Sequence, residues 1–231
     1  MLELAVFDMA GTTIDEHGAV YAALREAVER TGVSVAPGDL QTWMGTDKRE
    51  AIDALVRIGG GTVTPELVEE GYAAFRSILQ ERYRTKAPVA LPGVEQALAE
   101  LRARGIKVAL TTGFSDEVAG PLLASLGWST EEGGNLDAVV TSDEVRRGRP
   151  APYMIHRAME KTGVIDVTKV LTAGDTVVDV LAGRNAGAGV VIGVLTGELP
   201  REAFQDLPYS RVLGSVAEVP ELAETRPAGS S

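Results

Sequence analysis

The 231-residue chain contains no cysteine, so it can form no disulfide, supply no thiolate nucleophile and hold no zinc–thiolate site. It also lacks a long apolar run at its start, where Glu3 and Asp8 flank a short hydrophobic stretch. Such a start fits neither a secretory signal nor a membrane span. We therefore expect a cytoplasmic protein.

The chain also has few basic residues relative to acidic ones. The chain has 22 lysines and arginines against 33 acidic residues, which gives a formal net charge of −11. This balance argues against nucleic acid or an anionic membrane as a partner. A small anionic substrate remains possible, because screening over about 8–10 Å makes the local charges of a cleft more important than the total.

The hydrophobic pattern changes twice along the chain. Residues 4–7 are apolar and predict a buried strand, whereas residues 16–86 predict only helices. Expected helices there begin near Val20, after an N-cap at Asp47, and after Thr64. This length and pattern suit one large core with a smaller helical module inserted into it.

From Pro88 onward, strands and helices alternate. We expect strands at 106–111, 138–141, 170–173 and 190–194, the last being the final strand, with helices at about 91–104, from Ser115, at 152–161 and at 177–186. Residues 128–137 are irregular, and 227–231 are expected to fray. The predicted fold is α/β: a Rossmann-like parallel sheet flanked by helices in residues 1–15 and 87–231, with an all-helical cap at 16–86.

Asp8 follows the first predicted strand within the sequence Phe7-Asp8-Met9-Ala10-Gly11-Thr12-Thr13. A carboxylate at this end of a parallel strand lies in the crevice where open α/β sheets bind ligands. Gly11 permits a tight turn, and Thr12 and Thr13 can offer their hydroxyls and amides to an anion. Asp8 is thus either a nucleophile or metal ligand, or an ordinary turn or N-cap residue.

Three further polar groups follow strands or precede a helix. Thr112-Gly113 comes before a helix N-terminus, whose free amides favour an anion. Asp175 and Asp179 lie one helical turn apart, and Arg149 could bind a phosphate with two parallel hydrogen bonds. Each of these residues, taken alone, could simply be a helix cap or a surface charge. Their common position at strand ends favours a functional site.

With these four motifs in this order, the sequence resembles the haloacid dehalogenase superfamily over its whole length. The resemblance implies that Asp8 is the nucleophile, that Thr112 and Arg149 contact the phosphoryl group, and that Asp175 and Asp179 form the metal motif. Ala10, Gly11, Thr12 and Gly113 would complete the substrate-binding loops.

Three residues point to one branch of that superfamily. Most of its phosphatases have a second aspartate two residues after the nucleophile, and here that position is Ala10. Together with Arg149 and Lys48, this loop resembles the phosphonoacetaldehyde hydrolases (phosphonatases) and phosphonatase-like hydrolases, in which the cap lysine forms a Schiff base with the substrate aldehyde. The family's histidine three residues after the lysine is Ala51 here, and Phe114 replaces an aromatic hydroxyl, which leaves the identity of the carbonyl substrate open.

The chemistry links Ala10 with Lys48. Cleaving a P–C bond would leave a carbanion too basic for a nearby carboxylic acid to rescue, whereas a protonated imine accepts the electrons as an enamine. Two carboxylates beside a phosphoryl site imply Mg²⁺. The resemblance makes Asp8, Asp175 and the Ala10 carbonyl its ligands, with Asp179 steadying the site from behind.

Three functions remain open at this point. The first is a phosphonate hydrolase that uses Asp8 and Lys48, and the second is a phosphatase for a small phosphomonoester, similar to phosphoglycolate phosphatases, in which Lys48 only contacts substrate. The third is a phosphate-binding protein without catalysis. His17 and His156 are expected to be structural or exposed, and relatives of this type suggest a homodimer formed through the cap.

Overall fold

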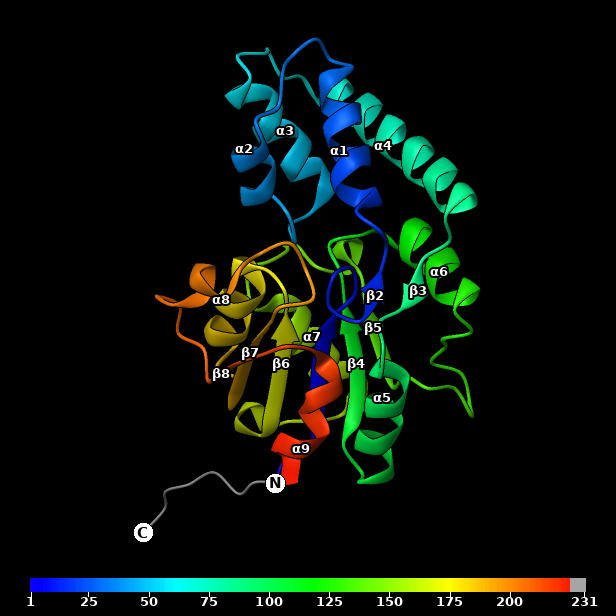
Figure 1. Ribbon diagram of the computed structural model, residues 1–231, viewed down its shortest axis with the longest axis vertical. Coiled ribbons are helices and arrows are strands. Elements are labelled where there is room, and N and C mark those ends of the chain that lie inside the picture. Colours follow the sequence, from blue (N-terminus) through cyan, green and yellow to red (C-terminus); the bar gives the residue numbers. More distant parts are fainter. Residues whose placement is uncertain (225–231) are drawn as a thin grey trace. The chain divides into compact units, whose positions relative to one another are not determined.

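The computed structural model describes residues 1–224, so the predicted frayed end at 227–231 lies outside the described residues. The chain divides into two compact units (Figure 1). One contains residues 1–14 and the chain from Ala90 onward, and the other contains Asp15–Val89. The assignment of residues 16–86 as a cap domain remains a prediction.

The first unit is built on a six-stranded sheet in which all five neighbouring pairs are parallel. In spatial order the strands are β5 (Ala138–Val140), β4 (Lys107–Thr111), β1 (Leu4–Asp8), β6 (Val170–Gly174), β7 (Val190–Val194) and β8 (Arg211–Leu213). This confirms the predicted parallel α/β fold. The expectation that 190–194 is the final strand was wrong, because β8 follows it; β8 has three residues and none is buried, so its apolar pattern is weak.

The chain first winds from β1 to β4 and β5, then crosses back to β6, β7 and β8. Right-handed crossovers in opposite directions place helices on both faces of the sheet. Helices α7 (Tyr153–Thr162) and α8 (Val177–Ala186) pack together on the face that carries Leu4 and Val6. Helix α5 (Val94–Ala103) contacts α9 (Val219–Glu224), and both lie in front of the strands in Figure 1. Helix α6 (Asp116–Ser125) connects β4 to β5.

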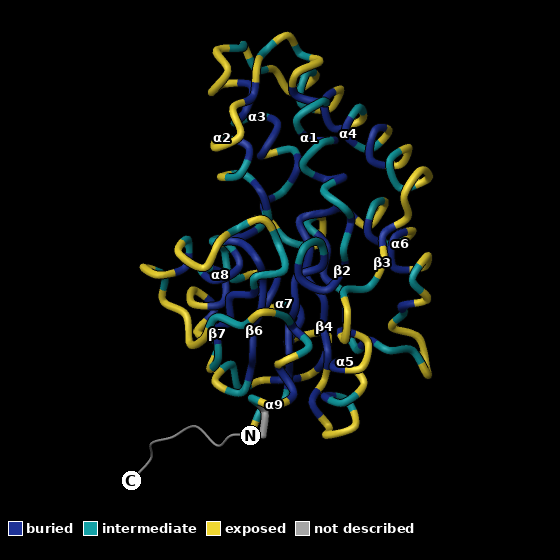
Figure 2. The backbone as a smooth tube through the Cα atoms, viewed as in Figure 1, coloured by how far each residue is buried: buried dark blue, intermediate teal, exposed yellow. Residues whose placement is uncertain are grey.

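Single 3₁₀ turns complete this unit: η1 (Ser142–Glu144), η2 (Val167–Lys169), η3 (Arg201–Phe204) and η4 (Val216–Glu218). The central strands form the core, and all five residues of β1 are buried (Figure 2). Burial of a side chain such as Leu4 or Phe7 contributes about 1.5–3 kcal/mol relative to exposure. The polar end of β1 is therefore fixed by a rigid apolar strand.

The second unit contains α1 (Ala19–Glu29), α2 (Pro37–Thr42), α3 (Lys48–Ile58) and α4 (Pro65–Thr85), with α4 packed against α1 and α3. As predicted, Asp47 caps α3, since its carboxylate accepts hydrogen bonds from the Arg49 and Glu50 amides at 2.9 and 3.1 Å. The Thr64 hydroxyl likewise accepts from the Leu67 amide. Helix α2 was not predicted from the sequence. Its six residues bury a single hydrophobic side chain, Leu40, and one such residue cannot show the spacing that is typical of a helix.

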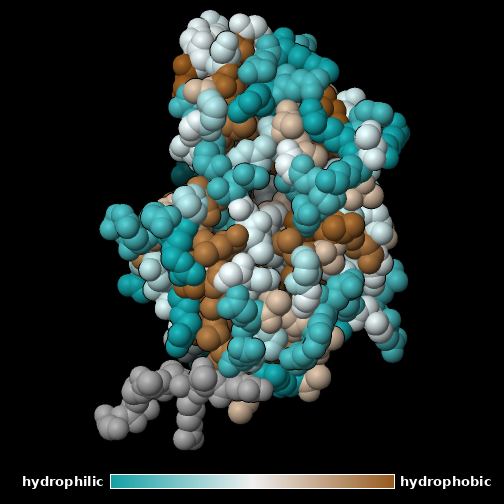
Figure 3. Space-filling view, in the orientation of Figure 1, coloured by the Kyte–Doolittle hydropathy of each residue, from teal (hydrophilic) through white to brown (hydrophobic). Residues whose placement is uncertain are grey.

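Two short strands, β2 (Ile14–Asp15) and β3 (Val89–Ala90), form a separate two-stranded sheet that the sequence did not predict. Next to it, His17 has a ring nitrogen 3.2 Å from the Ala87 carbonyl oxygen and the other 3.1 Å from Asp15. On the face shown in Figure 3, hydrophilic residues are widespread. None of the helices within residues 1–224 is both long and apolar enough to cross a membrane.

Candidate active site

Asp8 lies at the carboxyl end of β1, between the ends of β4 and β6. The loop after it turns tightly, because the amides of Thr12, Thr13 and Ile14 all donate to the Met9 carbonyl. Gly11 has a φ of 84°, which a side chain would strain. The Thr13 hydroxyl donates to the Asp8 carbonyl at 2.9 Å. The loop therefore holds the Asp8 backbone with few degrees of freedom.

The structure brings the three predicted aspartates together. Asp175 follows the end of β6, and Asp179 lies in the first turn of α8. One carboxylate oxygen from each of Asp8, Asp175 and Asp179 lies within 4.8 Å of the other two, and all three residues are buried. Three buried carboxylates at this spacing repel one another unless a cation neutralises them.

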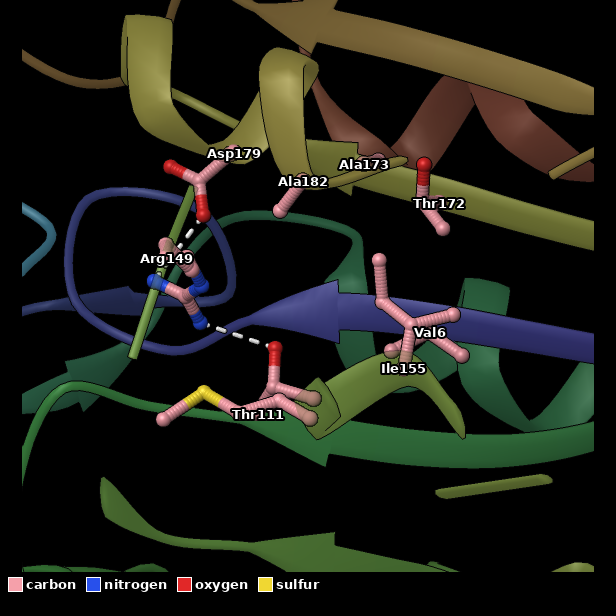
Figure 4. Close-up of a pocket in the computed structure, with 9 residues that line it drawn as sticks. Val6, Thr111, Arg149, Ile155, Thr172, Ala173, Asp179 and Ala182 are labelled. Carbon is pink, nitrogen blue, oxygen red and sulfur yellow. Dashed lines mark hydrogen bonds and ion pairs between the residues drawn. The ribbon is translucent and has the colours of Figure 1, made fainter. Parts of the chain in front are cut away.

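Arg149 supplies one positive charge to this cluster. Its Nη1 atom lies 2.5 Å from Asp8 Oδ1 and 2.9 Å from Asp179 Oδ1, and its Nη2 atom donates to Thr111 Oγ1 at 2.8 Å. Figure 4 shows the guanidinium between Asp179 and Thr111, at one end of a small cavity lined by Val6 and other apolar side chains. The predicted phosphate contact is thus a buried arginine that pairs with carboxylates.

Burial and mutual repulsion shift the pKa values of these groups. Desolvation raises the pKa of Asp8 to about 6, with Asp179 adding to the shift and the Arg149 charge opposing it. Desolvation also raises the pKa of Asp175 well above its usual range, and the charges of Asp8 and Asp179 act in the same direction. Burial alone would lower the pKa of Arg149, but Asp179 and Asp8 outweigh it, so that pKa is raised. The cluster therefore favours a bound cation.

Two threonines orient the acidic groups. The Thr12 hydroxyl donates to Asp175 Oδ1 at 2.8 Å. Thr176 is the N-cap of α8, and its amide and hydroxyl both donate to Asp179 Oδ2, with the amide at 3.1 Å. Asp179 thus uses one carboxylate oxygen for the helix start and the other for Arg149. This arrangement suits the predicted supporting role of Asp179.

The loop after β4 carries Thr112 and Gly113, both buried. The Thr112 amide donates to the Val140 carbonyl, and its hydroxyl accepts from the Phe114 amide at 3.1 Å. The sequence predicted free amides at the start of α6, but the Asp116 amide donates to the Asp143 carboxylate at 3.3 Å. That amide is already paired with a side-chain anion.

Lys48 belongs to the helical unit and is the first residue of α3. Its side chain is buried, and Nζ donates to the Thr46 carbonyl at 3.0 Å. Ala51, at the position of the phosphonatase histidine, is fully buried one turn further along the same helix. The lysine head group is therefore held against main-chain oxygen.

Three further residues contact the predicted site, and the sequence did not assign a role to any of them. Thr111 accepts from Arg149, and the Thr196 hydroxyl donates to the Gly11 carbonyl at 2.6 Å. Gly197 lies directly against the Asp175 carboxylate. Thr111 directly precedes the predicted motif, so its strand-end position was a usable signal, whereas Thr196 and Gly197 follow a strand that carries no acidic residue.

The donor set fits a hard divalent cation. The aspartates offer carboxylate oxygens, which Mg²⁺ prefers, and the donor atoms lie close enough to share one ion. Their raised pKa values indicate that positive charge in the cluster would be stabilising. The described residues therefore include a buried group that can bind a metal ion.

The fold and this site define a class of protein. The sequence model of haloacid dehalogenase-like hydrolases matches residues 2–187, and the chain belongs to this family. Within it, the chain is 32% identical over 224 residues to the phosphonoacetaldehyde hydrolase of Bacillus cereus strain AH820, covering 89% of this chain and 82% of that protein.

Solved structures give the same fold. A hydrolase from Pseudomonas syringae superposes with a TM-score of 0.85 at 24% identity, covering 96% of this chain and 98% of that chain. A phosphonoacetaldehyde hydrolase like protein from Oleispira antarctica superposes with a TM-score of 0.78 at 26% identity, covering 96% of this chain and 91% of the other. The resemblance seen in the sequence motifs is thereby confirmed.

Proposed function

We propose that the protein is a Mg²⁺-dependent hydrolase that cleaves the P–C bond of a small 2-oxoalkylphosphonate such as phosphonoacetaldehyde. The observation that carries this proposal is a buried lysine, Lys48, at the start of α3 in a chain whose nucleophile loop has Ala10 in place of a general acid. The similarity to phosphonoacetaldehyde hydrolases supports the same substrate class.

In the proposed reaction, the Lys48 amine attacks the substrate carbonyl carbon, and loss of water gives a protonated imine. An Asp8 carboxylate oxygen then attacks phosphorus as the P–C bond breaks, and the bonding electrons pass to the imine as an enamine. Water hydrolyses the aspartyl phosphate to phosphate. Protonation of the enamine carbon and hydrolysis of the imine release the aldehyde and restore Lys48.

The remaining residues position the phosphoryl group. A bound Mg²⁺ ion would neutralise phosphoryl charge, held by Asp8, Asp175 and the Ala10 carbonyl and supported by Asp179. Arg149 adds a fixed positive charge beside Asp8, and Thr12, Gly11, Thr112 and Gly113 supply the loops that would face the phosphoryl oxygens. Because the imine accepts the leaving electrons, Ala10 needs no acid group.

The imine is the step that tests the proposal. Borohydride added during turnover of phosphonoacetaldehyde should trap a reduced adduct, and mass spectrometry should locate it on the peptide that contains Lys48. Lys48→Arg keeps the positive charge but cannot form an imine, so it should lose P–C cleavage. Arg57→Lys, on an exposed part of the same helix, should leave turnover unchanged and form no additional adduct.

The alternative is a phosphatase for a small phosphomonoester, which the same Asp8 and acidic cluster would serve. In that case Lys48→Arg would retain ester hydrolysis and change mainly KM. A wild-type protein that hydrolyses phosphate esters well, yet gives no adduct with phosphonoacetaldehyde or longer 2-oxo phosphonates, would rule out the proposed P–C cleavage.

A further inference from the structure

The segment after β7, residues 195–199, is fixed at both ends. The Leu195 amide donates to the Leu213 carbonyl in β8 at 3.1 Å. Leu195 and Leu199 both pack against the buried cluster formed by Val180, Val191 and Phe204. The two residues between these anchors that face the acidic site, Thr196 and Gly197, are therefore held in place by hydrophobic packing on either side.

Thr196 is linked to Asp175 through one peptide group. Its hydroxyl donates to the Gly11 carbonyl at 2.6 Å, and that carbonyl shares a rigid plane with the Thr12 amide. The Thr12 hydroxyl in turn donates to Asp175 Oδ1 at 2.8 Å. Orienting the Gly11–Thr12 peptide therefore fixes the position from which Thr12 reaches the carboxylate.

Gly197 closes the other side of the same carboxylate. A Cβ atom at Gly197 would lie 1.9 Å from Asp175 Oδ2, and one at Gly11 would lie 2.6 Å from that same oxygen. Both distances are far below contact distance, so the Asp175 carboxylate lies in a slot between two glycine backbones. Any side chain at either position would displace it.

We infer that Thr196 and Gly197 are positioning residues that fix the Asp175 carboxylate and the nucleophile loop in one geometry. The Thr196 hydroxyl contacts the Gly11 carbonyl and the Gly197 backbone lies against Asp175, so the two residues act through Gly11, Thr12 and Asp175. The structural link stands by itself, and its consequence for catalysis rests on the proposed function. Because the anchors of the segment are hydrophobic, the geometry is set before any ligand binds.

Thr196→Val removes the hydroxyl and keeps the shape, whereas Thr196→Ser restores the donor. By calorimetric titration, Thr196→Val should bind Mg²⁺ about tenfold or more weakly than wild type, with a similar loss in kcat and little change in KM. Thr196→Ser should stay within about twofold of wild type on this scale. Gly197→Ala should lose more than Thr196→Val, because it displaces the carboxylate.

Thr168→Val is the matched control, since the exposed Thr168 hydroxyl donates to Asp166 on the same unit. It should change neither Mg²⁺ binding nor kcat. Wild-type Mg²⁺ affinity and kcat in Thr196→Val would overturn the inference. Equal losses in Thr196→Ser and Thr196→Val would do the same, because the hydroxyl would then be irrelevant.

A double-mutant cycle in EDTA separates this inference from the proposed function. The decreases in Tm caused by Thr12→Val and Thr196→Val should be less than additive in the double variant, because both break one chain of hydrogen bonds. Additive decreases would overturn the link, whatever reaction the protein catalyses. If the decreases in Tm are less than additive but the protein does not cleave a P–C bond, the link between Thr196 and Thr12 still holds. Only the proposed substrate would then be contradicted.

Discussion

Arg149 Nη1 lies 2.5 Å from Asp8 Oδ1, and both side chains are almost completely buried. The same guanidinium reaches Asp179, so a single cation holds two of the three clustered carboxylates. Removing one partner of a buried ion pair leaves uncompensated charge, which costs more than the pair itself contributes. The arginine is therefore important for stability, in addition to its proposed contact with a phosphoryl group.

Arg149→Met should lower the free energy of unfolding by about 3–5 kcal/mol at pH 7 in EDTA. The loss should be smaller at pH 5, because the pKa of Asp8 is raised to about 6 and the carboxyl then becomes neutral. Urea unfolding at both pH values measures this. Arg157→Met, which removes partly exposed ion pairs, should lower the free energy of unfolding far less, because solvent screens such pairs. An equal loss at both pH values for Arg149→Met would contradict the prediction.

Asp8→Ala should reduce turnover by at least about 10³-fold while the protein stays folded, because it removes the proposed nucleophile. Vanadate, which resembles a transferring phosphoryl group, should bind wild type only when Mg²⁺ is present. Asp166→Asn, at an exposed turn, should leave both properties unchanged. Steady-state kinetics and calorimetry test this, and residual turnover in a contaminant-free Asp8→Ala preparation would remove Asp8 from the proposed role.

Asp179→Asn should separate the two functions of this carboxylate. The amide oxygen can still accept from the Thr176 amide, so α8 should begin at the same residue and far-UV circular dichroism should not change. The charge that faces Arg149 is lost, so Mg²⁺ affinity should fall by about 10–100-fold. Unchanged Mg²⁺ affinity would show that the Asp179 charge does not support the metal site.

Glu16 provides a pH-dependent contribution within the helical unit. Burial raises the pKa of its carboxyl above the ordinary value, although hydrogen bonds from the Val20 and Ala19 amides oppose this. Between the unfolded pKa, about 4.3, and the raised folded pKa, the folded state binds more protons than the unfolded state. Stability should therefore fall as pH rises through this window.

Glu16→Gln keeps an oxygen that can accept from the Val20 amide and removes the titration. Relative to wild type, this variant should gain stability as pH rises from about 4 toward neutrality. Urea midpoints measured across that range test the sign. A difference between the two proteins that stays constant with pH would contradict a raised pKa for Glu16.

The sequence alone determined the fold class and grouped most residues of the candidate site. Residues 4–7, 108–110 and 170–174 are mostly apolar, and each stretch is followed directly by a polar residue, Asp8, Thr111 or Asp175. Parallel strands bring such ends to one edge of the sheet. Local signals also located the Asp47 and Thr64 caps, because capping depends on neighbouring residues. The sequence by itself thus groups Asp8, Asp175 and Asp179, which the fold brings together.

Other features depended on the tertiary structure. Strand β8 and helix α2 are too short to carry a period, so only packing defines them. Thr196 and Gly197 follow an ordinary apolar strand, and their contacts with Gly11 and Asp175 join residues more than 20 positions apart. Neighbouring residues determine where a helix or strand forms. The close approach of segments that are distant in the sequence depends instead on the packing of buried hydrophobic residues such as Phe204. The pairing of Arg149 with Asp8 also depends on the tertiary structure, because a buried guanidinium is stable only beside negative charge that the fold brings close to it.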